Sequence, residues 1–122
     1  MIPAARSSRF PYLDVHVRLG NLQYPDFEFD VEVLVDTGFS GGLSVPQGLI
    51  PERVRRRTES WCTLADGSII LARTYRGFVS VGPLQPVPTT ILVLPNQALL
   101  GRDVANHFML TFAYGRQATL EA

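Results

Sequence analysis

The sequence predicts an all-β domain, a single closed β-barrel with one or two short helices. Two stretches, residues 12–19 and 27–35, alternate apolar and polar side chains with the period of two that is typical of half-buried strands. Two further stretches, 60–64 and 69–81, are rich in β-forming residues and flank the small turn-forming segment 65–68. With 122 residues, we expect one domain over 1–122, with a flexible N-terminal segment over 1–9.

The first half of the chain is expected to begin with a β-hairpin. Gly20-Asn21 provides a turn between the two alternating stretches. The second stretch leads directly into a glycine-rich loop over 36–42, and a short strand follows at 43–45. Residues 47–57 are expected to form a brief helix, although Pro51 restricts it.

The second half is expected to contain a long hairpin and several short elements. The hairpin comprises 60–64 and 69–81, and Pro86 and Pro88 are expected to interrupt the β pattern after it. A buried strand over 89–94, one or two helical turns over 104–108, and strands over 109–114 and 117–120 complete the chain.

Composition narrows the classes of partner. Eleven arginines balance eleven acidic residues, so we expect no nucleic-acid partner. The longest apolar runs are far below the roughly 20 residues that span a bilayer, so we expect no membrane partner. A lone cysteine, Cys62, and a start without a basic region and apolar run predict a cytoplasmic location.

The clearest candidate for chemistry is Asp36, in the triplet Asp36-Thr37-Gly38. An apolar strand leads into it, and three glycines within positions 38–42 allow backbone conformations that a side chain would forbid. An ordinary turn, in which the aspartate accepts backbone hydrogen bonds, would explain the triplet alone. Its context favours a functional role.

That context resembles the retropepsin-like aspartic proteases. The strand and Asp-Thr-Gly loop, the hairpin tipped by Asp66-Gly67 and the downstream segment Leu99-Leu100-Gly101-Arg102-Asp103 occur in that family's order and spacing. The resemblance extends from about Tyr12 to the last strand and implies the acid-protease fold.

The resemblance also implies roles for particular residues. Asp36, Thr37 and Gly38 would be the catalytic triplet, with Thr37 joining two such loops across a two-fold axis. The substrate-binding residues and flap would be Phe39, Leu64, Ala65, Asp66, Gly67, Ser68 and Ile69. Leu99, Leu100, Gly101, Arg102 and Asp103 would support the active loop, and the strand after Phe112 would contribute to a dimer sheet.

The chemistry requires two carboxylates. Held a few ångströms apart, they share one proton, so one acts as base and the other as acid on a water molecule. Because this chain offers only Asp36 in such a loop, the family implies a homodimer that hydrolyses peptide bonds of a peptide or protein substrate. No cofactor and no metal are expected.

Phe39 and Ser40 depart from the retroviral members, which usually have a small residue and then an acid after Asp-Thr-Gly. We expect Phe39 to narrow the cleft, and Ser40 cannot form an ion pair with Arg102. Substrate preference is therefore not carried over from the family.

Other functions remain open. The main alternative is a peptide-binding or dimerisation module that has this fold without catalysis, and a small barrel that binds single-stranded nucleic acid is a third. His16, His107 and Cys62 lack metal-ligand spacing, and neither Ser44 nor Cys62 lies in a nucleophile motif. The loop over 38–42 lacks the lysine of a phosphate-binding loop, and the arginines at 53 and 55–57 are more typical of a solvated face.

Overall fold

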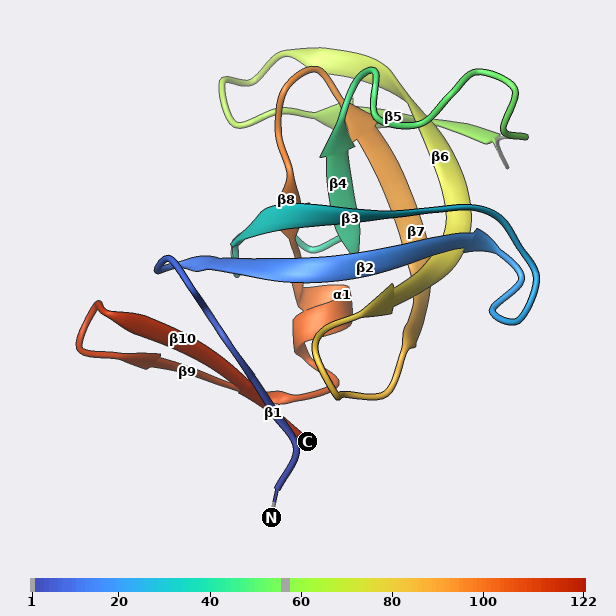
Figure 1. The fold of residues 1–122 in the computed structure, drawn as a ribbon. Coiled ribbons are helices and arrows are strands. Elements are labelled where there is room, and N and C mark those ends of the chain that lie inside the picture. Colours follow the sequence, from blue (N-terminus) through green and yellow to red (C-terminus); the bar gives the residue numbers. More distant parts are fainter. Residues whose placement is uncertain (1, 56–57) are drawn as a thin grey trace.

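A computed structural model of the protein describes residues 2–55 and 58–122. Figure 1 shows strands along nearly the whole chain and one short helix. The strands are β1 (Ala4–Arg6), β2 (Tyr12–Gly20), β3 (Pro25–Val35), β4 (Leu43–Pro46), β5 (Thr58–Thr63), β6 (Ile69–Ser80), β7 (Val87–Leu94), β8 (Leu99–Leu100), β9 (Met109–Ala113) and β10 (Gln117–Glu121), and the helix is α1 (Arg102–Ala105). The predicted all-β class is confirmed.

The strands form two sheets. The larger sheet has seven strands in the order β2-β3-β8-β4-β7-β6-β5, and β2 also pairs with β6. The smaller sheet has the order β1-β10-β9 and contains both ends of the chain. In the N-terminal segment that we expected to be flexible, Ala4–Arg6 form β1 and pair antiparallel with β10.

The predicted β2–β3 hairpin is present. Its strands pair antiparallel from Tyr12↔Leu34 to Gly20↔Pro25. Alternate residues of β2 are buried, because successive side chains of a strand point to opposite faces. This register fixes where β3 ends and therefore where the loop at Asp36 begins.

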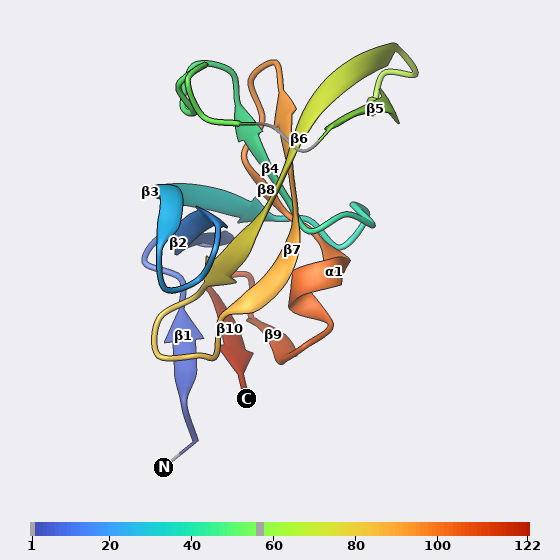
Figure 2. The ribbon, with the colours of Figure 1, turned by 90° about the vertical axis from the view of Figure 1, so that its right-hand side faces the viewer.

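The β5–β6 hairpin is also present, and Figure 2 shows it projecting beyond the rest of the larger sheet. β5 lies at the edge of that sheet. The tip turns through Gly67, whose φ of 87° suits glycine. The hairpin is thus supported from its β6 side, where β6 pairs with β7 and β2.

One local prediction was wrong, and two had displaced bounds. No helix forms in the described part of 47–57, residues 47–55, where Gly48 (φ 90°) and Pro51 favour turns, and 56–57 lie outside the described residues. The helix expected over 104–108 is α1, which begins at Arg102 directly after Gly101. Pro88 lies inside β7 rather than before it, and is tolerated because β4 pairs with β7 only from Ile91 onward.

The core is one cluster of buried side chains to which both sheets contribute. Burial of each large aliphatic side chain contributes about 1.5–3 kcal/mol. The core side chains that are almost completely buried include Leu13, Val15, Val17, Leu19, Val33, Leu43, Val45, Val79, Ile91, Leu100, Val104 and Leu120. In the part of the chain that the structure describes, no helix is long and apolar enough to cross a membrane.

Candidate active site

Asp36 lies where β3 leaves the core. Val33 and Val35 are buried with 0% and 7% exposure, so the end of the strand is held in place by packing. Asp36 itself is half-buried, and Thr37 and Gly38 are exposed. The sequence thus places a carboxylate at the junction between a buried strand and an accessible loop.

Backbone groups of the loop hold the Asp36 side chain. The Gly38 amide donates to Asp36 Oδ1 at 2.9 Å, and the Phe39 amide donates to the Asp36 carbonyl at 3.1 Å. Among the described residues, Oδ2 has no hydrogen-bond partner. One carboxylate oxygen is therefore oriented by the loop, and the other is open to an additional group.

The segment expected to support the loop contacts it through four backbone hydrogen bonds. The amide of Asp36 donates to the Leu100 carbonyl at 3.0 Å, and the amide of Gly101 donates to the Gly42 carbonyl at 2.9 Å. Two residues at the start of α1 complete the set, since the amide of Arg102 donates to the Phe39 carbonyl (2.8 Å) and that of Asp103 to the Gly41 carbonyl (3.1 Å).

Close packing between Phe39 and two glycines adds to this support. A Cβ atom built on Gly41 would lie 2.6 Å from the Phe39 ring, and one built on Gly101 would lie 2.7 Å from it and overlap the Gly41 carbonyl. Glycine is therefore required at position 101, where backbone atoms approach, whereas a side chain at position 41 would need the Phe39 ring to move. The Phe39 ring lies against the loop as well as bordering the cavity described below.

Side-chain hydrogen bonds connect the loop region to the larger sheet. Thr89 Oγ1 of β7 donates to Asp103 Oδ2 at 2.6 Å. The completely buried Ser44 accepts from the Leu99 amide and donates to the Gln97 carbonyl, both at 3.1 Å. These bonds fix β8 and α1 relative to β4 and β7.

A cavity of about 440 Å³ extends from Asp36 to the β5–β6 hairpin. Its lining residues that the sequence analysis predicted are Asp36, Gly38, Phe39, Leu64, Ala65 and Leu99. Segments far apart in the sequence, the acid-bearing loop and the hairpin, thus border the same space.

The other predicted site residues lie outside this lining. Thr37 is exposed beside it, and Leu100, Gly101, Arg102 and Asp103 are behind the loop that they support. At the hairpin tip, Asp66, Gly67 and Ser68 are exposed, and Ile69 is 64% exposed instead of contributing to the cavity.

The hairpin tip has its own hydrogen bonds. The hydroxyl and the amide of Ser68 donate to Asp66 Oδ1 at 2.6 and 2.9 Å. Both bonds lower the pKa of the Asp66 carboxyl below its usual value, and the bond from the hydroxyl has the larger effect. The tip is therefore ordered around a carboxylate.

Five further residues line the cavity and were not predicted: Leu34, Cys62, Thr63, Leu94 and Gln97. The period of two in β5 could have identified Cys62, which lies on the same strand face as Leu64. Leu94 is the last residue of β7, whereas Gln97 comes from the β7–β8 connection, for which the sequence has no comparable signal.

Among the described residues, no group of three or more His, Cys, Asp or Glu side chains could hold a metal ion. His16 instead forms a hydrogen bond through Nδ1 to Asp30 Oδ1 at 2.7 Å on the solvent face of the β2–β3 hairpin.

Comparison with known proteins places this geometry in a structural class. No family model and no curated protein sequence matches the chain. A retropepsin-like aspartic protease from Rickettsia conorii matches in structure with a TM-score of 0.61 and 14% sequence identity, covering 99% of this chain and 92% of that chain. The chain has a retropepsin-like fold.

In the retropepsin-like fold of this chain, one carboxylate faces a cavity that a hairpin borders. Asp36 Oδ1 accepts from the Gly38 amide, while Oδ2 has no hydrogen-bond partner among the described residues. A single carboxylate cannot serve as base and acid in the same step. Among the described residues that line the cavity, Asp36 is the only acid, so two-carboxylate chemistry at this site would need a second one.

Proposed function

We propose that the protein is an aspartic endopeptidase that acts as a homodimer. The observation that carries the proposal is that Asp36 and the β5–β6 hairpin border one cavity of about 440 Å³. An extended peptide in that cavity would pass between the acid and a hairpin able to exclude water. The Rickettsia conorii structure, described as a protease, adds support at the level of the fold.

In the proposed reaction, two Asp36 carboxylates, one from each subunit, hold a water molecule between them. Because two adjacent carboxylates do not both ionise readily, the pair retains one proton. The ionised member takes a proton from the water as it attacks the peptide carbonyl, and the protonated member donates to the carbonyl oxygen. The tetrahedral intermediate then collapses as the leaving nitrogen is protonated, without a covalent enzyme intermediate.

The loop geometry supports this role for Asp36. The Gly38 amide orients Asp36 Oδ1. Four backbone hydrogen bonds join the loop over 36–42 to residues 100–103 and restrict its movement. Preorganisation of this kind lowers the cost of bringing two acids to a fixed separation. By the resemblance, Thr37 would join the two loops across the two-fold axis.

Exposed apolar residues near the smaller sheet support a dimer. Met109, Phe112 and Tyr114 are 59%, 45% and 95% exposed on or beside β9, an edge strand of that sheet. The Phe112 ring contacts Phe10 in an edge-to-face arrangement at 5.6 Å. In Figure 1, β3 ends on the same side of the molecule, at the left, as the β9–β10 turn.

The decisive experiment compares the wild-type protein with Asp36→Asn on a diverse peptide library between about pH 4 and pH 7, where a shared-proton pair can operate. Mass spectrometry would identify the cleaved bonds. Asparagine keeps an oxygen that can accept from the Gly38 amide, so circular dichroism should show an unchanged fold.

We expect cleavage by the wild-type dimer and none by Asp36→Asn. If the wild-type protein sediments as a dimer and cleaves no peptide that the variant leaves intact, the peptidase proposal is wrong. A non-catalytic peptide-binding or dimerisation module would then be the better account.

A further inference from the structure

The β5–β6 hairpin has three exposed apolar side chains that do not line the Asp36 cavity. Trp61, Ile69 and Leu71 are 74%, 64% and 48% exposed. Trp61 pairs with Leu71 and Thr63 with Ile69, so these side chains share one face of the hairpin. We call Trp61, Ile69 and Leu71 the outer patch.

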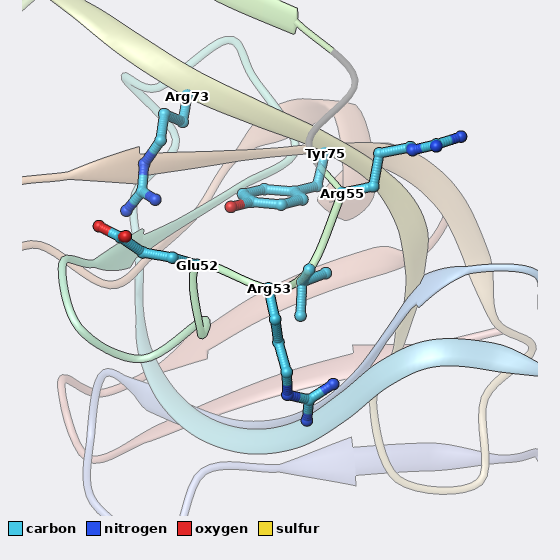
Figure 3. Close-up of a pocket in the computed structure, with 6 residues that line it drawn as sticks. Glu52, Arg53, Arg55, Arg73 and Tyr75 are labelled. Carbon is cyan, nitrogen blue, oxygen red and sulfur yellow. The ribbon is translucent and has the colours of Figure 1, made fainter.

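The same face continues along β6 into a polar pocket. Residues 69, 71, 73 and 75 alternate onto one side of the strand, and the chain between β4 and β5 covers the last two. The pocket there has a volume of about 470 Å³ and is lined by Glu52, Arg53, Val54, Arg55, Arg73 and Tyr75. We call it the arginine pocket; Figure 3 shows its side chains.

Tyr75 directs its hydroxyl into the arginine pocket. The residue is only 2% exposed, yet the hydroxyl has no hydrogen-bond partner among the described residues. In Figure 3 it points toward the side of the pocket where the head groups of Arg73 and Glu52 lie. Because no buried side-chain oxygen or nitrogen of the described residues lacks a partner, this hydroxyl oxygen reaches the solvent in the pocket, where it can donate to a ligand.

The charges of the arginine pocket favour an anion of low charge. Three arginines and one glutamate line it, and Figure 3 shows the head groups of Arg53 and Arg55 pointing away from the Tyr75 hydroxyl, so Arg73 is the cation on the side of that hydroxyl. Arg73 makes no ion pair with a described residue, although Glu59 lies opposite it in the β5–β6 register. Arginine binds carboxylates through two parallel hydrogen bonds, whereas Glu52 and Glu59 would oppose a doubly charged group.

We propose that the outer patch and the arginine pocket together bind an extended peptide segment of a partner protein that has a carboxylate among apolar side chains. The carboxylate accepts from the Arg73 guanidinium and the Tyr75 hydroxyl. The neighbouring apolar side chains cover Trp61, Ile69 and Leu71, which are contiguous with the pocket along β6. The site does not use Asp36, so this inference stands apart from the proposed peptidase activity.

The chain contains a single tryptophan, Trp61, so its fluorescence reports directly on the outer patch. The probes are five acetylated, amidated pentapeptides of leucine and alanine, with one aspartate at each position in turn. A matched set has asparagine in place of aspartate. Asp36→Asn is the background for all titrations, which prevents cleavage of the probes.

We expect at least one aspartate peptide to shift the Trp61 emission to shorter wavelength with saturation. The affinity of the asparagine counterpart should be lower by about tenfold or more, because its side chain cannot form the charge-assisted hydrogen bonds. Arg73→Gln and Tyr75→Phe should each weaken binding, and Tyr75→Phe keeps the buried ring. Arg76→Gln, an exposed arginine whose position alternates to the other face of β6, is the matched control and should bind normally.

Several results would overturn the proposal. These are equal binding of the aspartate and asparagine sets, no shift with any peptide up to about millimolar concentration, or binding insensitive to Arg73→Gln in a variant with normal circular dichroism. An emission shift that follows protein concentration alone would assign the patch to a second copy of the chain. A shift produced only by phosphatidylglycerol vesicles would assign it to a membrane surface.

Discussion

The main-chain amide of Asp36 donates a hydrogen bond to the carbonyl of Leu100 at 3.0 Å. This bond joins the candidate catalytic loop to the segment that leads into α1. Because Leu100 is completely buried, the loop is attached to the core at the residue that has the carboxylate. The position of Asp36 therefore depends on packing around 99–103.

Gly101→Ala should disturb that attachment. A methyl group at this position would meet the Gly41 carbonyl and the Phe39 ring. We expect overpacking to lower the free energy of unfolding by about 1–3 kcal/mol, and peptidase activity to fall with it. Urea denaturation measures the first effect; Ser40→Ala, at an exposed position of the same loop, should stay within about 0.5 kcal/mol of wild type. A Gly101→Ala protein as stable as wild type would show that the loop can move away.

Alkylation of Cys62 should block the cavity. It is the only cysteine of the chain, and it lines the cavity together with Asp36. We expect modification by iodoacetamide to abolish peptide cleavage, because the added group occupies the space between the hairpin and the loop. Cys62→Ala should be active and resistant to the reagent. Full activity of a protein that mass spectrometry shows to be completely alkylated would mean that the peptide substrate does not bind in this cavity.

Ser68→Ala should raise the pKa of Asp66 toward its usual value. The Ser68 hydroxyl is the main cause of the lowered pKa, and the Ser68 amide bond would remain. Since the pKa is lower in the folded state, the Asp66 carboxylate stabilises the tip above its ordinary pKa, and this contribution is lost as the pH falls through the folded-state value. Carbon-detected NMR titration of Asp66 measures both values. An unchanged pKa in Ser68→Ala would mean that the hydroxyl bond is absent in solution.

Charged substitutions near β9 should weaken the proposed dimer. Met109→Glu and Tyr114→Glu place a carboxylate on the exposed apolar surface beside the smaller sheet. We expect the dimer dissociation constant to rise about tenfold or more, which corresponds to about 1.4 kcal/mol. Sedimentation equilibrium provides the measurement, and Tyr24→Glu is the control, since Tyr24 is 82% exposed at the distant β2–β3 turn. Equal effects at Tyr24 and Tyr114 would argue against this surface.

Much of the fold could be predicted because alternation reports directly on burial. Val15 and Val17 alternate with Asp14, His16 and Arg18, and β2 forms there as expected. The helix prediction failed at 47–55, the described part of that range, where a tolerable helical composition competes with the turn preferences of Gly48 and Pro51. The start of α1 was missed because its first residues, Arg102 and Asp103, are also the ones whose amides bind the Asp36 loop.

The candidate site was predictable where motifs are local. Asp36 and the hairpin residues Leu64 and Ala65 could be named from the sequence, and they line one cavity. Gln97 could not, because its place depends on how the β7–β8 connection passes Ser44, a tertiary contact. Ile69 was assigned to the cavity from its position beside the tip, but the strand alternation places it on the outer face.

The central claim is that Asp36 supplies half of a site. Wild-type protein and Asp36→Asn, mixed and allowed to exchange subunits at constant total concentration, test it directly through the rate of peptide cleavage. Because a heterodimer has one Asp36, we expect activity to follow the square of the wild-type fraction, about a quarter of the full rate in an equal mixture. Activity proportional to the wild-type fraction would contradict the account, because each chain would then act alone.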